Sequence, residues 1–323
     1  MYRLIVALAA LLGAAGAAPA QDWPNRPVTM VVPFPAGGAV DAIGRIMATR
    51  MSEILGRQVV IENVGGAGGM TGAARVAKAP PNGYQFLLGR NGTLAVVPTL
   101  YKYPMYQATT DFEPVVLFAE QPTIMTARND FPAENLREFI AYAKANEAKI
   151  TYGSAGVGSA NHVACVLFNS AAGLNITHVP YRGGALAMQD LLGGRIDYVC
   201  NIVTTAISQI EGKLIKPMAI LGKNRTPILP NVPSAADQGL PDLDAAAWYA
   251  FFLPKGTPAP IVQKLREATI ATIETPAVQE RLKEIGADLV APERRSTDYL
   301  TKFVVSEIER WGAPLKAAGV TAE

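Results

Sequence analysis

Short, almost wholly apolar segments alternate with helical patterns along nearly the whole chain. Residues 28–33 read VTMVVP, and residues 41–55 then place apolar side chains at helical spacing. Strands without polar alternation are typical of a parallel sheet that helices cover on both faces. This rhythm predicts an α/β protein.

The alternation continues in two runs. Further strands are expected at 59–63, 84–89, 150–154, 177–180, 197–201, 217–221 and 248–253, and further helices at 71–78, 136–146, 162–172, 185–192, 205–211, 260–274, 277–285 and 298–318. Two long apolar stretches, 112–127 and 245–253, separate the runs. We interpret them as crossings between two α/β halves, at a hinge that closes the halves over a ligand.

The first residues of the chain resemble an export signal. Met1-Tyr2-Arg3 is a short basic segment, residues 4–12 are apolar, and Ala18-Pro19-Ala20 has the pattern of a cleavage site. A membrane anchor is the alternative, but residues 4–20 are too few and too rich in Gly and Pro for a spanning helix. We expect an exported, periplasmic protein that loses residues 1–20.

Composition excludes two classes of protein. Hydrophobic residues make up 50% of the chain, enough to build cores in two domains, so intrinsic disorder is excluded. Lys and Arg number 29 against 27 Asp and Glu, and this near-neutral balance argues against a nucleic-acid binder.

Glycine-rich or polar loops follow four of the expected strands. In the first, residues 33–41, Gly37 and Gly38 permit a tight turn and Asp41 can cap the next helix. Similar loops occur at 89–93, 153–159 and 181–184. Ligands bind at such strand-to-helix turns in open α/β folds, where helix N-termini favour anions. We expect two facing walls of backbone donors.

An arginine and two aromatic residues lie near these loops. Arg90 is expected to be an exposed loop cation that is either solvated or forms a bidentate pair with a carboxylate. Trp248 and Tyr249 lie on the second crossing, and each of them either faces the cleft or packs in the core.

Catalytic and cofactor chemistry receive little support. The glycines of 66–72 imitate a dinucleotide-binding turn but do not follow the first strand. With His162 and His178 as the only histidines, no metal site is indicated, and we predict no cofactor. An exported hydrolase that uses Ser154 or Ser159 with His162 stays open as an alternative, although helix capping by Ser159 is the simpler interpretation.

The two cysteines are Cys165, in an expected helix, and Cys200, at the end of an expected strand. The exported compartment permits a disulfide between them. Two buried free thiols are the alternative, because sequence does not fix the separation of their Cα atoms.

Several motifs resemble those of the Bug (TctC-type) family of periplasmic substrate-binding proteins. They are the stretch VPFPAGGAVDAIGRIMATRMSEILGRQVVIENVGGAGGMTGA at 32–73, Asn-Gly-Tyr at 82–84, ITHVPYRG at 176–183, DLLGGRID at 190–197, LPNVPS at 229–234 and LPKGTP at 253–258. Together they cover most of the chain in one order. The resemblance implies a two-lobed, Venus-flytrap binding protein of the type II kind, with two mostly parallel sheets and no enzyme activity.

The resemblance also implies an architecture and partners. Residues 21–121 and 246–296 would form domain I, 122–245 domain II, and 297–323 a C-terminal helix and tail. The implied partners are a small carboxylate and the membrane permease of a tripartite tricarboxylate transporter, with a sensor kinase as a further partner class. The protein is expected to be a monomer.

The candidate ligand-binding residues come from the loops and from the resemblance. They are Phe34, Ala36, Gly37, Gly38, Ala39, Asp41, Arg90, Asn91, Gly92, Thr93, Ser154, Gly158, Ser159, Asn161, His162, Tyr181, Gly183, Asn201 and Trp248. Members of the family often carry Ser or Thr at the position of Arg90, and Phe-Asp-Asn at 200–202. Arg90 suits a second carboxylate, and the missing Asp argues against an amine. The resulting hypothesis is a dicarboxylate, aliphatic or aromatic.

Overall fold

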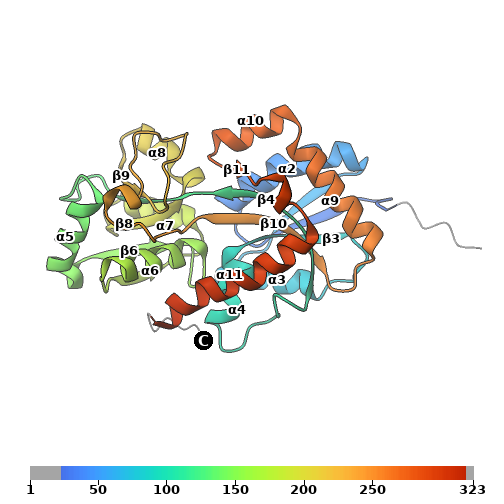
Figure 1. The fold of residues 1–323 in the computed structure, drawn as a ribbon, viewed down its shortest axis with the longest axis horizontal. Helices are drawn as coiled ribbons and strands as arrows, with labels where there is room; N and C mark the ends of the chain where they lie inside the picture. Colours follow the sequence, from blue (N-terminus) through green and yellow to red (C-terminus); the bar gives the residue numbers. More distant parts are fainter. Residues whose placement is uncertain (1–22, 318–323) are drawn as a thin grey trace, which may run out of the picture.

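The computed structural model describes residues 23–317, in two α/β lobes joined by extended strands (Figure 1). The export signal expected at 1–20 and the end of the expected tail, 318–323, lie outside these residues. None of the helices within 23–317 has the length and hydrophobicity required to span a bilayer.

Lobe I is built around a six-stranded sheet. Its strands are β1 (Val28–Val32), β2 (Val59–Asn63), β3 (Gln85–Arg90), β4 (Phe112–Gln121), β10 (Ala247–Pro254) and β11 (Asp288–Leu289), in the order β11-β4-β10-β3-β1-β2. The helices of this part of the chain are α2 (Ala39–Leu55), α3 (Met70–Ala77), α4 (Val97–Leu100), α9 (Ala259–Ile273), α10 (Pro276–Glu284) and α11 (Thr297–Ala317).

Lobe II is built around a five-stranded sheet. Its strands are β5 (Thr123–Arg128), β6 (Thr151–Ser154), β7 (Thr177–Pro180), β8 (Tyr198–Ile202) and β9 (Ile215–Ile220), in the order β7-β6-β8-β5-β9. Its helices are α5 (Leu136–Asn146), α6 (Ala160–Ala172), α7 (Gly184–Leu192) and α8 (Ile207–Glu211).

Both sheets are mixed, and most strands of each run in one direction, as expected. In lobe I, β1 runs parallel to β2 and β3, whereas β10 runs antiparallel to both β3 and β4. In lobe II, β6 runs parallel to β7 and β8, whereas β5 runs antiparallel to β8 and β9. The antiparallel strands β10 and β5 are segments that have just crossed from the other lobe, whereas β11, which also runs antiparallel to β4, is not. The two-lobed α/β fold is confirmed.

The two crossings lie side by side between the lobes (Figure 1). Pro122 alone separates β4 from β5, so one nearly continuous extended segment serves both sheets. The return crossing leads into β10, and Thr123 Oγ1 donates to the Ala245 carbonyl at 2.6 Å. Each lobe therefore retains its own sheet while both share this two-stranded connection, an arrangement suited to a hinge.

The C-terminal helix α11 contacts both lobes. It packs on β4 of lobe I and on α6 of lobe II. Its Glu307 is buried, and its carboxylate accepts hydrogen bonds from the indole N–H groups of Trp248 and Trp311, each at 2.7 Å. The bond from Trp248 attaches α11 to the crossing strand β10. The helix thus shares a hydrophobic core with both sheets.

Two segments differ from the expected elements. Residues 89–93 were expected to be a loop, but Arg90 ends β3, and a π-helical turn (Gly92–Val96) then leads directly into α4. The other is β11, whose two residues are too few to leave a periodic pattern in a sequence.

Candidate functional site

A cavity of about 240 Å³ lies between the two lobes. From the expected set it is lined by Phe34, Ala36, Gly38, Ala39, Arg90, Asn161 and Gly183, and among its other lining residues are Pro35, Val40, Ala155, Arg182, Leu186, Ile202 and Thr205. The loops after β1, β6 and β7 thus meet at one place, together with the end of β3. These are the carboxyl ends of parallel strands, as expected for an open α/β fold.

The loop after β1 is held in shape by Asp41 and Asn63. One Asp41 carboxylate oxygen accepts from the Gly37 N–H at 2.9 Å and from Arg45 Nε at 2.8 Å. The Asn63 amide donates to the other Asp41 oxygen and to the Phe34 carbonyl, both at 3.0 Å. Burial acts to raise the pKa of Asp41, but these hydrogen bonds outweigh it and hold the pKa below its ordinary value.

This network changes the roles assigned to two expected ligand contacts. The Gly37 N–H is engaged by Asp41, and neither Gly37 nor Asp41 lines the cavity. Gly37 adopts φ +83°, a conformation that favours glycine. Asp41 therefore orders the loop, and Asn63, which sequence reasoning missed, assists it from the end of β2.

The N-terminus of α2 opens onto the cavity. Its N-cap residue is Gly38, so no side chain caps the first turn, and Ala39 and Val40 of that turn line the cavity. The first N–H groups of a helix have no partner within it and carry a partial positive charge. This end of the cavity is suited to an anion.

Arg90 lies at the inner wall and is 2% exposed, so the expectation of an exposed loop cation is wrong. Its guanidinium carbon lies 5.4 Å from the ring centre of Phe34 and 5.8 Å from that of Tyr249. Within the described residues, Nε and Nη2 of Arg90 have no hydrogen-bond partner. Burial lowers the pKa of Arg90, yet an arginine keeps its charge in proteins, so an unpaired cation faces the cavity.

The residues that follow Arg90 support it and do not line this cavity. Thr93 Oγ1 accepts from the Arg90 N–H at 3.1 Å and donates to the Arg90 carbonyl at 2.9 Å. Asn91 is fully buried, and its side-chain oxygen and nitrogen lack partners in the described part of the chain. Gly92 approaches the Gly158 carbonyl of lobe II.

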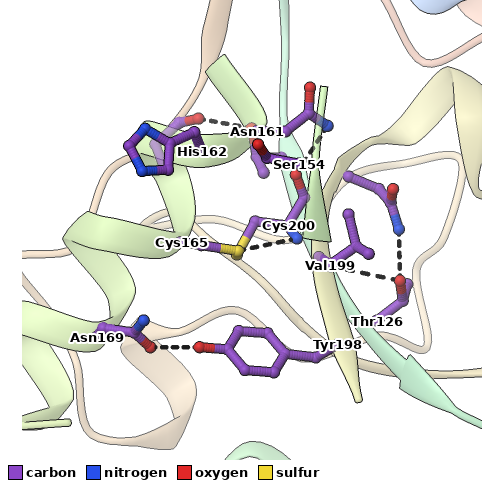
Figure 2. Close-up of a disulfide and its surroundings, with 12 residues drawn as sticks. Thr126, Ser154, Asn161, His162, Cys165, Asn169, Tyr198, Val199 and Cys200 are labelled. Carbon is purple, nitrogen blue, oxygen red and sulfur yellow. Dashed lines mark hydrogen bonds between the residues drawn. A yellow bond between two sulfur atoms is a disulfide. The ribbon is translucent and has the colours of Figure 1, made fainter. Parts of the chain in front are cut away.

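In lobe II, α6 begins at the cavity and is fixed to β8 (Figure 2). Ser159 Oγ accepts from the His162 N–H at 3.3 Å, which confirms the capping role. Asn161 lines the cavity and donates to the Cys200 carbonyl at 3.1 Å. Of the two alternatives for the cysteines, the structure has the disulfide, which joins Cys165 of α6 to Cys200 of β8.

The structure does not form the serine–histidine pair that the alternative, an exported hydrolase, would require. Ser154 Oγ lies 2.7 Å from Nε2 of His178, not beside His162, whose Nδ1 accepts from the Gly158 N–H at 3.2 Å. Ser154 is fully buried, and neither it nor Ser159 lines the cavity. A hydrolase with His162 as its base therefore has no structural support.

Three further expected residues point elsewhere. Trp248 faces α11, whereas its neighbour Tyr249, on the opposite face of β10, takes the position beside Arg90. Asn201 donates to Thr126 Oγ1 within the sheet of lobe II. Tyr181 donates to Asp190 at 2.7 Å and lines an adjoining cavity of about 770 Å³. Among residues 23–317, no cluster of three or more potential metal ligands is present.

Comparison with known proteins identifies the family. The model of the tripartite tricarboxylate transporter family receptor, TctC, matches residues 43–320. A protein encoded in the TAR-I ttuE-ttuC′ intergenic region of Agrobacterium vitis is 40% identical over 303 residues, which cover 94% of this chain and 87% of the relative.

Solved structures agree with this assignment. The periplasmic binding protein BugD is 39% identical, with a TM-score of 0.88 over 93% of this chain and 100% of its own. MatC from Rhodopseudomonas palustris, solved with bound malate, is 36% identical, with a TM-score of 0.87 over 91% and 100%. Rpa4515 from R. palustris, solved with adipate, is 34% identical, with a TM-score of 0.88 over 93% and 99%. This chain therefore belongs to the TctC, or Bug, family of periplasmic binding proteins, the receptors of tripartite tricarboxylate transporters.

Proposed function

We propose that this protein is an extracytoplasmic receptor for a small dicarboxylate, aliphatic or aromatic, which it delivers to the membrane permease of a tripartite tricarboxylate transporter. One carboxylate of the ligand sits at the N-terminus of α2. The other pairs with Arg90. The lobes close on the ligand about the β4–β5 and β10 crossings.

The buried, unpaired guanidinium of Arg90 is the observation that carries the proposal. A desolvated cation without a partner costs folding free energy, and a ligand carboxylate would recover it. Phe34 and Tyr249 lie against the guanidinium, while Nε and Nη2 lack partners. These two nitrogens form one edge of the guanidinium, and this edge can donate to both oxygens of a carboxylate in a planar, bidentate pair.

The charges around the cavity favour a dianion. Arg90 and Arg182 both line it, whereas the nearby Asp41 is already engaged by Arg45 and two N–H donors. Within residues 23–317, no Asp or Glu lines the cavity, so an amine on the ligand would lack a counter-charge there. The dicarboxylates malate and adipate bound to MatC and to Rpa4515 support the same class of ligand.

The test compares Arg90→Ala and Arg90→Lys with the wild type by calorimetric titration of dicarboxylates and of their monocarboxylate analogues. We expect wild-type binding of at least one dicarboxylate, and a loss of about 30- to 100-fold in Arg90→Ala, the range for a charge-assisted hydrogen-bonded pair. Arg90→Lys would recover only part of the loss, because a lysine is a point charge. Affinity for monocarboxylates would change little.

Arg281, exposed on α10, provides a matched control, and Arg281→Ala should bind as the wild type does. Equal dicarboxylate affinity in Arg90→Ala and wild type would remove Arg90 from the site. Failure of the wild type to bind any acid, together with no small acid in native mass spectra of freshly purified protein, would contradict the receptor function itself. Delivery is tested separately, by capture of the permease subunits with ligand-loaded protein.

A further inference from the structure

The lobes meet backbone to backbone beside the cavity. Gly68 belongs to the turn Ala67–Gly69, which precedes α3 in lobe I, and it faces the loop after β6 in lobe II. A Cβ atom added at Gly68 would lie 2.5 Å from the Val157 carbonyl oxygen and 3.2 Å from the Gly158 carbonyl carbon. No side chain separates the two lobes here.

A second contact between the lobes lies near the first. A Cβ added at Gly183, in lobe II, would lie 3.4 Å from Pro35 Cγ in lobe I. Pro35 and Gly183 both line the 240 Å³ cavity, and the turn of Gly68 lines the adjoining 770 Å³ cavity. The two contacts between the lobes therefore lie at the walls of the two adjoining cavities.

We propose that the contact of Gly68 with Val157 is a closure stop that limits the length of the acid this receptor holds tightly. The proposal rests on the proposed function. Backbone atoms in contact cannot approach further or repack, unlike the ends of flexible side chains. The stop, and not the ligand, then fixes the distance between the α2 N-terminus and the lobe II wall. An acid too long for that distance keeps the lobes from reaching the stop.

The proposal makes Gly68 a specificity-determining residue that need not touch the ligand. Gly68→Ala would insert a methyl group where there is no space, so the lobes could close only to a wider separation. Ligands that fit the wild-type cavity would lose contact with one wall. Longer acids, which are already held at a wider separation, would lose less.

The chain offers a matched control for the backbone strain of this change. Gly68 has φ +66°, so an alanine there is strained whatever the space around it. Gly173, the C-cap of α6, has φ +65°, and an added Cβ would meet nothing within 4 Å. Gly173→Ala therefore carries the same conformational cost without the contact between lobes.

The experiment titrates succinate, glutarate, adipate and pimelate into wild type, Gly68→Ala and Gly173→Ala. We expect Gly68→Ala to weaken the tightest wild-type ligand about tenfold or more relative to Gly173→Ala, with a smaller loss for the longer acids. Equal affinities in the two variants, or an equal loss for every length, would overturn the stop. Absence of binding to the wild type would instead contradict the proposed function.

Hydrogen exchange on the wild type supplies a readout that does not depend on a variant. Tight-binding acids should protect the amides of both 65–70 and 155–159, because these segments meet at the stop. An acid longer than the limit should protect the α2 N-terminus but not this pair of segments. Equal protection of the pair by acids of every length would also overturn the proposal.

Discussion

Ser154 and His178 are joined by a hydrogen bond of 2.7 Å between the Ser154 hydroxyl and Nε2 of His178, directly behind the lobe II wall of the cavity. The His178 ring stacks on His162, with ring centres 4.1 Å apart, and on Tyr152 at 4.8 Å. His162 in turn accepts from the Gly158 N–H. Two neutral imidazoles therefore hold the loop that meets Gly68.

This pair predicts a loss of stability in mild acid. Burial lowers the pKa of His162 to about 4, and burial together with His162 lowers that of His178 to about 3, from an ordinary 6.5. The unfolded chain therefore binds protons between pH 6.5 and 4 that the folded chain does not, and stability falls as the pH falls. From pH 6.5 to 5 each histidine should cost about 2 kcal/mol, because both folded pKa values lie below this window.

The free energy of unfolding in urea, measured at several pH values, checks this prediction. His178→Phe keeps an aromatic ring in the stack but cannot take up a proton, so it should remove about half of the slope between pH 6.5 and 5. It would also lose the bond to Ser154 and be less stable at every pH. An unchanged slope would show that other groups carry the pH dependence.

Most strands of the fold could be predicted from the apolar composition of buried strands. Strands buried on both faces are mostly apolar, so the segments that became β1, β3 and β8 were recognisable from their composition. Strand direction was not recognisable, because pairing partners for β5 and β10 come from distant parts of the chain. Which strands run antiparallel therefore appeared only in the structure.

The parts of the candidate site that were predictable are those built from residues close together in the sequence. The turn after β1 and the cap at Ser159 depend on residues within a few positions of each other. The surroundings of Arg90 depend on Phe34, from the loop after β1, and on Tyr249, from β10, so its burial was not predictable. Sequence could not decide whether Trp248 or Tyr249 faces the ligand site, because this depends on which face of β10 covers Arg90. The other face is covered by α11.

The disulfide between Cys165 and Cys200 predicts a redox-dependent stability. It closes a loop across a sequence separation of 35, and both cysteines are fully buried. Cross-links of this kind typically contribute about 2–4 kcal/mol to the free energy of unfolding. The double variant Cys165→Ala, Cys200→Ala should lose about that amount. It should also bind ligand more weakly, because Asn161 reaches the Cys200 carbonyl from the bridged helix.

Alkylation followed by mass spectrometry checks the bond itself. The native protein should take up no alkylating reagent in denaturant until reductant is added. Uptake of two equivalents without reductant would mean that the cysteines are free. If the double variant matched the wild type in urea, the bridge would carry no net stability.

The hydrogen bonds of Asp41 to Gly37 and Asn63, and not its ion pair with Arg45, are expected to hold the loop after β1 in shape. Asp41→Asn removes the buried charge that accepts from the Gly37 N–H and from Asn63, and it should lower the free energy of unfolding by about 1–3 kcal/mol, the range for hydrogen bonds to a charged group. Ligand affinity should fall with it, because this network shapes the turn at the start of α2.

Arg45→Ala is the control, since it deletes the other partner of the same carboxylate. Arg45 is 58% exposed at its side chain, and solvent and salt screen exposed ion pairs, so this pair contributes little to stability. Because the ion pair is screened by solvent, we expect Arg45→Ala to bind ligand nearly as the wild type does, as measured by calorimetric titration. If Arg45→Ala instead matched Asp41→Asn in both measurements, the ion pair and not the loop hydrogen bonds would hold the site in shape.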